Sequence, residues 1–394
     1  AVWDVSPGTL CAGSVLFEPH FCGANHGDVT GVMDELADVT QGAADCAPAG
    51  SAGSGACGRF AGAVEGLPDL TASPQHTEVC GRFAPTPSGR MHLGNVFSCL
   101  LAWLDARRAG GSIVLRMEDL DPATCDRQKA LQLMDDLRWL GLTWDGDPWY
   151  QSERSWAYGE ALEALKAQCL VYPCFCSRAE LHAANAPHAS DGTYIYAGTC
   201  RGLSAAEVAE RSLVKRPALR MMVPELSDPA GSIEFIDGVY GPQSTVLARD
   251  CGDFLVRRSD EVYAYQLAVV VDDAAMGVNH VVRAHDLMGS SGRQRYLQHV
   301  LGLGEMEYFH VPLLVAPDGR RLAKRDFDLD LGSLRTWMRG PERLLGLLAW
   351  KVGLIERFEP VSAIELVSEF SWDKVTARRD DIVVDEALVD ALRG

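Results

Sequence analysis

The segment from Gly81 to Val96 reads GRFAPTPSGRMHLGNV and combines three glycines and two prolines with a single histidine. It lies between an apolar stretch typical of a strand and one typical of a helix. Free backbone N–H groups at such a turn, together with the positive end of the helix dipole, favour phosphate oxygens. His92, between Gly89 and Gly94, would then stabilise charge that develops on a phosphoryl group. The alternative is a histidine that only caps the helix.

A second segment, DGRRLAKRD, lies far downstream and carries four basic residues after a turn. The pattern predicts an exposed loop that presents Lys324 and Arg325. A mobile lysine that closes on a triphosphate stabilises charge while the phosphate bonds reorganise. The alternative is a solvated basic loop without chemistry, but the presence of both segments in one chain favours nucleotide chemistry.

Three cysteines with ligand-like spacing occur in the stretch YPCFCSRAELHAANAPHASDGTYIYAGTCRGL. Cys174, Cys176 and Cys200 would supply three thiolates, and structural Zn²⁺ prefers four tetrahedral ligands. His182 and His188 are candidates for the fourth position on chemical grounds. The alternative is three buried free thiols, which the Cys-x-Cys spacing alone does not exclude.

The elements that must position His92 are predicted by apolar periodicity. EVCGRFA, from Glu78 onward, is typical of a buried strand, and NVFSCLLAWLDARRAGG has helix-spaced apolar residues that end in a glycine pair. SIVLRMED is typical of a second buried strand. A strand, a helix and a parallel strand form a βαβ unit, which indicates an α/β protein.

The rest of the chain is predicted to alternate between helices and buried sheet. Helices are expected over 125–140 and 152–170, before the loop-rich stretch that holds the cysteines. YAYQLAVVVDDA and NHVVRAHDL predict a return to the buried sheet. From Ser333 onward we expect a mainly helical C-terminal part.

Composition limits the class of protein. The chain has 394 residues, 47% of them hydrophobic, and a formal net charge of −18. A negative surface repels phosphates, so indiscriminate nucleic-acid binding is disfavoured and any RNA would need a local basic groove. No apolar segment approaches the length of a membrane-spanning helix, so we expect a soluble protein.

Residues 1–77 differ in composition from the rest and are rich in Ala, Gly, Ser and Asp. The first 76 of them carry nine acids and one base, Arg59, and we assign the region no function. The chain has 12 cysteines, but its first residues lack the features of a signal peptide. We therefore expect a reduced, cytoplasmic protein.

Four motifs together resemble one enzyme family. RFAPTPSGRMHLGN is similar to the first signature of the class I aminoacyl-tRNA synthetases, the HIGH motif, in its glutamate-type form. RRLAKR occupies the place of the second signature, KMSKS, and RMEDLD resembles the family's RIEDTD. YAYQLAVVVDDAAMGVNHVVRAHDL resembles the amino-acid pocket and the strand behind it. The motifs follow the family's order from Glu78 to the end of the chain.

This resemblance implies that ATP, with Mg²⁺, and L-glutamate are substrates. The implied ATP-binding residues are His92, Gly94, Asn95, Lys324 and Arg325, with His92 and Lys324 catalytic. The implied glutamate-binding residues are Arg82, Phe83, Ala84, Pro85, Thr86, Glu118, Tyr265 and Arg283. Glutamate has two carboxylates and one ammonium, so Arg82 and Arg283 suit the carboxylates and Glu118 suits the ammonium. The alternatives are a surface carboxylate for Glu118, a structural ion pair for Arg283, and core packing for Tyr263 or Tyr265.

The resemblance also bears on the zinc ligands and on the second signature. In the family the fourth zinc ligand is a tyrosine in the context Y-x-G-T-C, which corresponds to Tyr196. The second signature departs from the family pattern because Arg321 replaces its first lysine and Ala323 replaces its serine. The loss of that hydroxyl removes one hydrogen bond to the nucleotide, whereas Lys324 is retained. We expect a working enzyme with slower activation.

The length of the chain favours one member of the family. Only 69 residues follow Arg325, too few for the helical domain with which full glutamyl-tRNA synthetases read the anticodon. The chain resembles the shortened paralogues, the glutamyl-queuosine tRNA(Asp) synthetases, which transfer glutamate to queuosine in the anticodon of tRNA(Asp). Two alternatives remain: a truncated glutamyl-tRNA synthetase that charges the tRNA 3′ end, and a catalytically silent tRNA-binding paralogue. We expect a monomer.

The predicted fold is therefore a class I Rossmann-type nucleotide-binding domain with a zinc-containing insertion, a short helical C-terminal part and no anticodon-binding domain. The expected parts are an acidic extension of unknown role (1–77), the first half of the catalytic domain (78–170), the insertion (171–250), the second half with the KMSKS-like loop (251–332) and the helical part (333–394).

Overall fold

The computed structural model describes residues 78–177, 180, 195–320, 322 and 329–393. The acidic extension, His182, His188 and the segment with Arg321, Ala323, Lys324 and Arg325 lie outside the described residues. Within the described part, no helix combines the length and the apolar character needed to cross a membrane.

The first half of the molecule is a parallel sheet with a crossover helix. β1 (Cys80–Phe83) pairs in parallel with β2 (Ser112–Met117), which pairs in parallel with β3 (Trp149–Tyr150). The connection between β1 and β2 is α2 (Leu93–Arg108), whose apolar side is buried against the sheet. α3 (Arg127–Trp139) and α4 (Ser155–Ala167) follow, one on each side of β3 in the sequence. The predicted βαβ unit is confirmed, and the two expected helices are shorter at both ends.

The second half forms a separate four-stranded sheet, in the order β7-β6-β10-β9, on the other side of β1. β9 (His280–Ala284) pairs in parallel with β10 (Glu307–Val311), and β10 pairs in parallel with β6 (Ser232–Asp237), which forms an antiparallel hairpin with β7 (Gly241–Val246). β9 lies next to β1, because the Asn279 N–H donates to the Cys80 carbonyl. Across both sheets the parallel strands lie in the spatial order β3-β2-β1-β9-β10. Successive strands are thus added first on one side of β1 and then on the other, as in doubly wound nucleotide-binding folds.

One predicted strand is a helix. The run YQLAVVVDDAA forms α8 (Tyr265–Ala275), not a strand of the sheet. Seven consecutive residues of α8, Leu267 to Asp273, are buried, because the helix packs between α4, α9 (Met288–Val300) and β8 (Phe254–Arg257). A helix buried on all sides has the same continuous apolar pattern as a buried strand, and three adjacent valines favour the strand interpretation. The strand predicted from NHVVRA is confirmed as β9.

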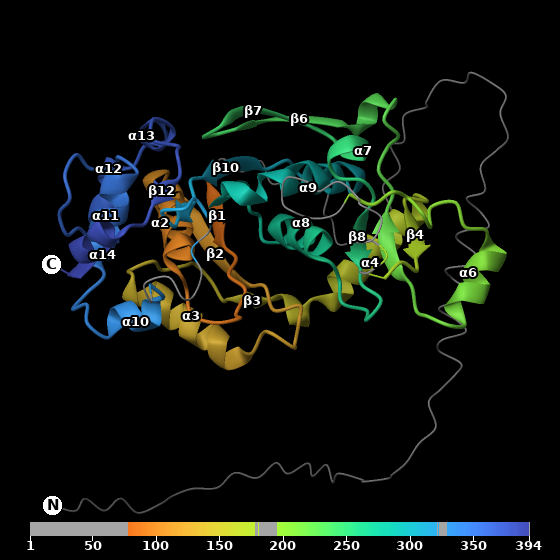
Figure 1. Ribbon diagram of the computed structural model, residues 1–394, viewed down its shortest axis with the longest axis horizontal. Helices are drawn as coiled ribbons and strands as arrows, with labels where there is room; N and C mark the ends of the chain where they lie inside the picture. Colours follow the sequence, from red (N-terminus) through yellow and green to blue (C-terminus); the bar gives the residue numbers. More distant parts are fainter. Residues whose placement is uncertain (1–77, 178–179, 181–194, 321, 323–328, 394) are drawn as a thin grey trace, which may run out of the picture.

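A smaller antiparallel sheet lies at one end of the molecule (Figure 1). β4 (Val171–Cys174), β5 (Ala218–Met221) and β8 form it, so its third strand comes from after residue 250. α6 (Ala205–Ser212) lies outside this sheet (Figure 1). The short elements of this region are 3₁₀ turns at Pro229–Gly231 and the one-turn helix α7 (Leu247–Asp250).

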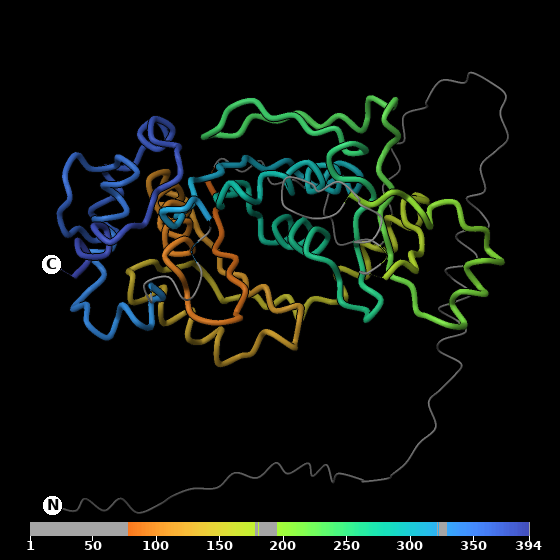
Figure 2. The backbone as a smooth tube through the Cα atoms, viewed as in Figure 1, coloured from red at the N-terminus to blue at the C-terminus, as the bar shows by residue number. Residues whose placement is uncertain are grey.

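The C-terminal part is mainly helical, as predicted. It contains α10 (Leu331–Arg335), α11 (Glu342–Lys351), α12 (Ala363–Glu369), α13 (Trp372–Thr376) and α14 (Glu386–Arg393), with the parallel pair β11 (Leu314–Val315) and β12 (Ile382–Val383). These helices share one apolar core with α2, β1 and β2, and Figure 2 shows the C-terminal segment, in blue, next to the orange segment that holds α2. The last helices are therefore packed into the same body as α2 and the first sheet.

A buried acid holds this C-terminal part against the sheet. Asp105, on α2, is 6% exposed, and its two oxygens meet His280 Nδ1 at 2.8 Å and the Trp372 indole N–H at 2.7 Å. The Trp372 ring stacks on Phe309 with 4.4 Å between centroids. Burial alone would lower the pKa of His280, but the hydrogen bond and the charge of Asp105 raise it above 6.5. His280 is therefore protonated in the folded protein over a wider pH range than in the unfolded chain.

We predict that Asp105→Asn destabilises the protein by about 2 kcal/mol at about pH 6, because it removes a buried charged acceptor from two partly buried donors. His280 has a raised pKa in the folded state, so the stabilisation is complete below pH 6.5 and is lost as pH rises through that pKa. Urea unfolding at about pH 6 and about pH 8.5 measures this. The difference between wild type and variant must shrink at the higher pH, and a constant difference would contradict the prediction.

Candidate functional site

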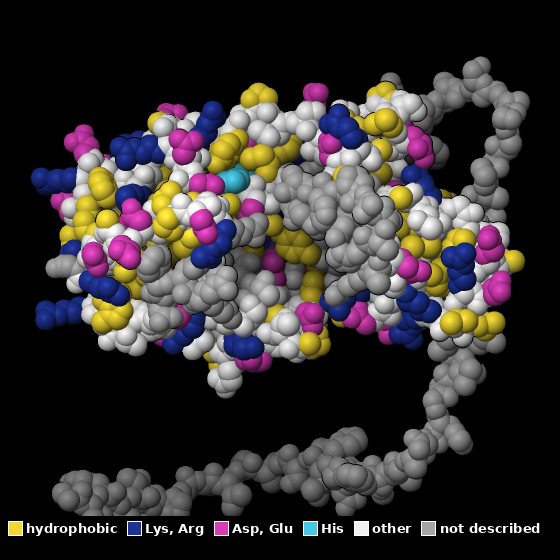
Figure 3. Space-filling model, in the orientation of Figure 1, with side chains coloured by type: hydrophobic (Ala, Val, Ile, Leu, Met, Phe, Trp, Pro, Cys, Tyr) yellow, Lys and Arg dark blue, Asp and Glu magenta, His cyan; other side chains and the backbone are white. Residues whose placement is uncertain are grey.

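A cavity of about 440 Å³ opens where the carboxyl end of β1 meets α2, α8 and β9. Its volume falls within the range of small-molecule sites. Figure 3 shows a hollow in the middle of the viewed face, between the places that β1 and α8 occupy in Figure 1. The predicted site residues that line the cavity are Arg82, Phe83, Ala84, Pro85, Thr86, His92, Asn95, Glu118, Tyr265 and Arg283.

The turn before α2 forms one wall. His92 is the N-cap residue of α2 with extended backbone angles, and its N–H donates to the Asn95 side-chain oxygen at 3.2 Å. Gly94 is not among the lining residues, and a Cβ placed on it would meet nothing within 4 Å, so the first turn of α2 has open space beside it. His92 thus occupies the predicted capping position and also faces the cavity.

The described residues that follow the second signature segment reach the same turn. Asp330 forms a β-bridge with His92, and the Leu331 N–H donates to the Met91 carbonyl at 2.9 Å. These contacts connect the N-terminus of α10 to the turn that holds His92. The predicted Lys324 and Arg325 precede it in the sequence and lie outside the described residues.

A buried ion network forms the floor of the cavity. Arg116, on β2, is fully buried and donates to Asp273 Oδ1 at 2.5 Å and to Glu118 Oε1 at 3.2 Å. Arg82 Nε lies 3.8 Å from the same Asp273 oxygen and has no hydrogen-bond partner among the described residues, while its Nη1 donates to the Val282 carbonyl. Glu118 is therefore held by a charge pair and is not the surface carboxylate of the alternative interpretation.

This network makes the cavity suited to anions. Burial lowers the pKa of Arg82, Asp273 opposes this shift, and the neighbouring charges of Arg116 and Arg283 lower it further. A bound carboxylate would raise the pKa of Arg82 again, because it would add negative charge beside the guanidinium. Burial also raises the pKa of Glu118, although Arg116 counteracts it. A cation near Glu118 would favour its ionised form.

Arg283 is fixed from three directions. Its Nε donates to His310 Nε2 at 3.1 Å, its Nη1 to Gln294 at 2.8 Å and its Nη2 to Ser291 at 2.8 Å. All of these partners are neutral, so the structural ion pair of the alternative interpretation is absent among the described residues. Arg283 keeps its positive charge unpaired beside the cavity.

The two candidate tyrosines have different environments. Tyr265 starts α8 and lines the cavity. Tyr263 packs edge-on against Tyr158 with ring centroids 5.5 Å apart, in the core beside α4. The core-packing alternative is therefore correct for Tyr263 only, because the helix begins between the two residues.

The sequence analysis missed the acids that hold the arginines. Asp272 accepts hydrogen bonds from Gln151, Arg154 and Tyr158, and Asp273 holds Arg116. Two adjacent acids at the end of an apolar run were a usable signal, because a buried carboxylate requires a partner. No local signal identified Arg116 as that partner, since it lies 157 residues away from Asp273.

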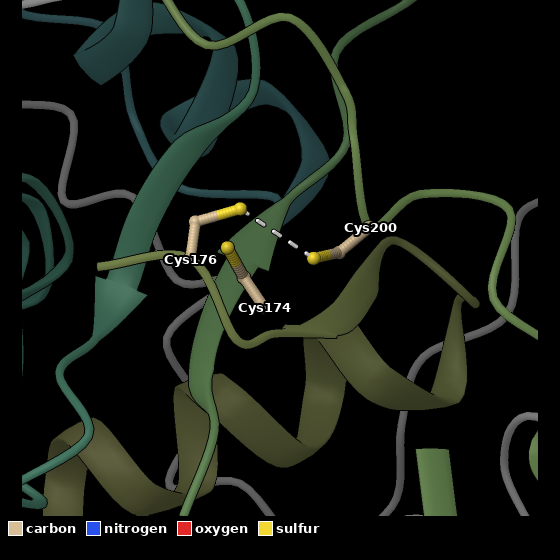
Figure 4. Close-up of side chains that lie close together, drawn as sticks. All are labelled: Cys174, Cys176 and Cys200. Atoms are coloured by element: carbon tan, nitrogen blue, oxygen red, sulfur yellow. Dashed lines mark hydrogen bonds between the residues drawn. The ribbon is translucent and has the colours of Figure 1, made fainter. Parts of the chain in front are cut away.

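The three predicted cysteine ligands come together in the small sheet (Figure 4). The Sγ atoms of Cys174, Cys176 and Cys200 all lie within 4.8 Å of one another. The Tyr196 hydroxyl lies 3.5 Å from both Cys174 and Cys176, and it accepts the Cys200 N–H at 2.8 Å. Three sulfurs and one phenol oxygen around a common point form a donor set that suits a soft metal ion such as Zn²⁺.

A cation stands beside the sulfurs. Arg220 Nε donates to Cys174 Sγ at 3.3 Å, and the guanidinium lies 3.9 Å from the centre of the Tyr196 ring. Burial would raise the pKa of the Cys174 thiol, but the hydrogen bond with Tyr196 and the charge of Arg220 lower it overall. The surroundings thus favour the thiolate of Cys174, the form that binds metals, whereas burial raises the pKa of the Cys176 thiol to about 11. His182 and His188, the other candidates for the fourth ligand, lie outside the described residues.

Comparisons with known proteins decide the family. The family profile described as tRNA synthetases class I (E and Q), catalytic domain, matches residues 78–385. A protein of Symbiobacterium thermophilum named glutamyl-Q tRNA(Asp) synthetase is 45% identical over 328 residues, which cover 80% of this chain and 99% of the relative. The chain belongs to the glutamyl-Q tRNA(Asp) synthetase family. It is therefore a class I aminoacyl-tRNA synthetase-like ligase, as predicted.

Further members and solved structures agree with this family. A glutamyl-Q tRNA(Asp) synthetase of Nitratidesulfovibrio vulgaris is 42% identical over 323 residues, covering 79% of this chain and 98% of the relative. The crystal structure of a glutamate tRNA ligase from Elizabethkingia meningosepticum, in complex with its amino acid, superposes with a TM-score of 0.67 at 24% identity. It covers 80% of this chain and 68% of that structure, and the likeness shows a shared fold.

Within this glutamyl-Q tRNA(Asp) synthetase family member, Arg116 should be the most sensitive residue of the cavity floor. We predict that Arg116→Met destabilises the protein by about 3–5 kcal/mol, because it leaves Asp273 and Glu118 without the cation that both contact. The matched control is Arg357→Met, whose arginine is 83% exposed and lies 3.4 Å from Glu359. Urea unfolding should show a change below about 1 kcal/mol for this control. Equal effects of the two substitutions would refute the role of the network.

Proposed function

We propose that the protein activates L-glutamate with ATP and transfers it to queuosine in the anticodon of tRNA(Asp). The observation that carries the proposal is the cavity in which Arg82, Arg283 and Glu118 meet beside the His92 turn. The names of the relatives, which share almost their whole length with this chain, support the choice of amino acid and acceptor.

Glutamate matches the charges of the cavity. Its two carboxylates pair with the guanidinium groups of Arg82 and Arg283, since planar guanidinium recognises carboxylate with two parallel hydrogen bonds. Its ammonium lies against Glu118, which Arg116 holds in place. Phe83, Ala84, Pro85, Thr86 and Tyr265 complete the walls.

Activation is a displacement at phosphorus. The α-carboxylate of glutamate attacks the α-phosphorus of ATP in line, the bond to the bridging oxygen breaks, and pyrophosphate leaves. His92, Asn95 and the first turn of α2 near Gly94 bind the phosphates, and Lys324 and Arg325 add positive charge to them. The protein accelerates this step by positioning the reactants and by neutralising charge. Mg²⁺ on the triphosphate would add to that neutralisation.

Transfer consumes the mixed anhydride. A hydroxyl of queuosine attacks the activated carbonyl, an ester bond forms, and AMP leaves. No general base is assigned, because the anhydride is already activated for attack.

We propose in addition that Cys174, Cys176, Cys200 and Tyr196 bind one structural Zn²⁺. The convergence of the three sulfurs on the Tyr196 hydroxyl supports this set. When bound, the ion would cross-link β4 to the loop before α6. Arg220 would then balance the excess negative charge of three thiolates and a phenolate.

We predict about one equivalent of zinc in protein purified without chelator, and less than a tenth of an equivalent in Cys200→Ser. Cys251→Ser is the control, because this buried thiol lies outside the cluster. Elemental analysis and the melting temperature with and without a chelator measure both effects. Less than a tenth of an equivalent in the wild type would refute the metal site.

The activity test is glutamate-dependent exchange of pyrophosphate into ATP, with and without tRNA. We expect exchange without tRNA, because the proposed activation step involves only ATP and glutamate. Exchange that requires tRNA would favour a glutamyl-tRNA synthetase that charges the 3′ end. Absence of exchange under both conditions would favour a silent tRNA-binding paralogue.

The acceptor is tested with two matched preparations of tRNA(Asp). One lacks queuosine and the other lacks the 3′-terminal adenosine. Labelled glutamate should be transferred to the second and not to the first. The opposite result would move the acceptor from the anticodon to the 3′ end.

A further inference from the structure

A buried Asp–His pair stands behind Arg283, on the side away from the cavity. Asp237 ends β6 and His310 lies on the neighbouring strand β10, and both are at most 1% exposed. Asp237 Oδ2 lies 2.6 Å from His310 Nδ1. His310 Nε2 in turn accepts the Nε–H of Arg283 at 3.1 Å.

The contacts fix which ring nitrogen of His310 carries the proton. The same Asp237 carboxylate accepts the backbone N–H groups of Val239, Tyr240 and His310, so it acts as an acceptor throughout. Nδ1 must then donate to Asp237, which leaves a lone pair on Nε2 for Arg283. A proton on Nε2 would point at the N–H of a cation and would repel it.

The surroundings keep His310 neutral. Burial lowers its pKa to about 4, against the opposing effect of Asp237, and the charge of Arg283 contributes to the lowering. A neutral ring can accept from Arg283 without adding positive charge beside it. This is the state that the geometry requires.

The donors of Arg283 divide into two sets. Guanidinium carries five N–H groups. Three of them are directed to His310, Gln294 and Ser291. One N–H on each terminal nitrogen remains, and Arg283 lines the cavity. The three neutral contacts therefore set the direction in which the remaining two donors point.

We propose that Asp237 and His310 are positioning residues that hold Arg283 in the orientation needed to bind a carboxylate of the amino-acid substrate. The inference rests on the proposed function for the identity of that substrate. Neither residue touches the cavity, so both act through Arg283.

The fold brings the pair together by a close approach of two strands. The Gly238 N–H donates to the Tyr308 carbonyl, and a Cβ on Gly238 would lie 2.1 Å from the Phe309 ring. A side chain at position 238 would collide with the Phe309 ring, so glycine allows β10 to approach closely just after Asp237. The β6–β7 hairpin therefore supports the cavity without lining it.

The test compares two substitutions of His310. Methionine is similar in size and lacks a nitrogen acceptor, whereas glutamine keeps an oxygen acceptor within reach of Arg283. In pyrophosphate exchange we expect His310→Met to raise KM for glutamate about tenfold or more, because a buried charged donor loses its partner. KM for ATP should change less than about threefold, and His310→Gln should restore KM for glutamate to within about threefold of wild type.

Asp105→Asn is the matched control, because Asp105 and His280 form another Asp–His pair, which is partly buried, includes β9 and does not line the cavity. It should lower the melting temperature and leave both KM values unchanged. An unchanged KM for glutamate in a folded His310→Met variant would overturn the proposal. So would equal increases of both KM values, or a glutamine variant as impaired as the methionine variant.

A second measurement does not depend on the substrate. ¹⁵N NMR of the imidazole of His310 in the wild type, assigned by loss of its signals in His310→Gln, should show a neutral ring with the proton on Nδ1. A proton on Nε2 would overturn the proposal whether or not the enzyme exchanges pyrophosphate. If the wild type shows no exchange but the proton is on Nδ1, the proposed function fails while the hold on Arg283 stands.

Discussion

The guanidinium of Arg116 is fully buried between β2 and α8, where it pairs with Asp273 and Glu118 and lies 3.9 Å from Asp272. A buried cation without partners would lower the free energy of unfolding by several kcal/mol. The first and second halves of the molecule must therefore bring these acids together for the fold to be stable. β2 belongs to the first half and α8 to the second. The same contact that joins the halves also fixes Glu118 and, through Asp273, the position of Arg82. The cavity is therefore complete only when the two halves are packed together.

The network leaves specific charges unbalanced at the cavity. Asp272 is divided among Arg154, Gln151, Tyr158 and Arg116, and Asp273 is divided between two arginines. Arg283 is surrounded by neutral partners. Burial is the main cause of the lowered pKa of Arg82, and the positive charges of Arg116 and Arg283 lower it further. A substrate with two carboxylates and one ammonium brings one net negative charge, which reduces the excess of positive charge.

The sequence predicted those parts of the site whose signals are local. His92 and Asn95 occur in one turn, and the three cysteines have ligand spacing, so their proximity needed little knowledge of the fold. Asp237 and His310 are 73 residues apart and belong to no motif, so only the pairing of β6 with β10 reveals them. α8 was predicted as a strand because complete burial removes the periodicity that distinguishes a helix. The helix matters for the site, because a strand would point Asp272 and Asp273 to opposite faces. On the helix Asp272 binds residues of α4 while both acids remain near Arg116 of β2.

The cysteine cluster lies apart from the cavity but is mechanically connected to it. β5 carries Arg220, which contacts the cluster. β5 and its neighbour β8 share one apolar core with α4, α8 and α9. On α4, the Tyr158 hydroxyl donates to Asp272 at 2.7 Å, and Arg154, at its N-cap, binds the same carboxylate at 2.6 Å. A metal ion that cross-linked the cysteines would make the small sheet more rigid and would thereby restrict α4. α4 in turn holds Asp272, the acid beside Asp273. Because interiors are close-packed, a shift of that sheet would be transmitted to Arg116 and to Arg82 and Glu118, which line the cavity.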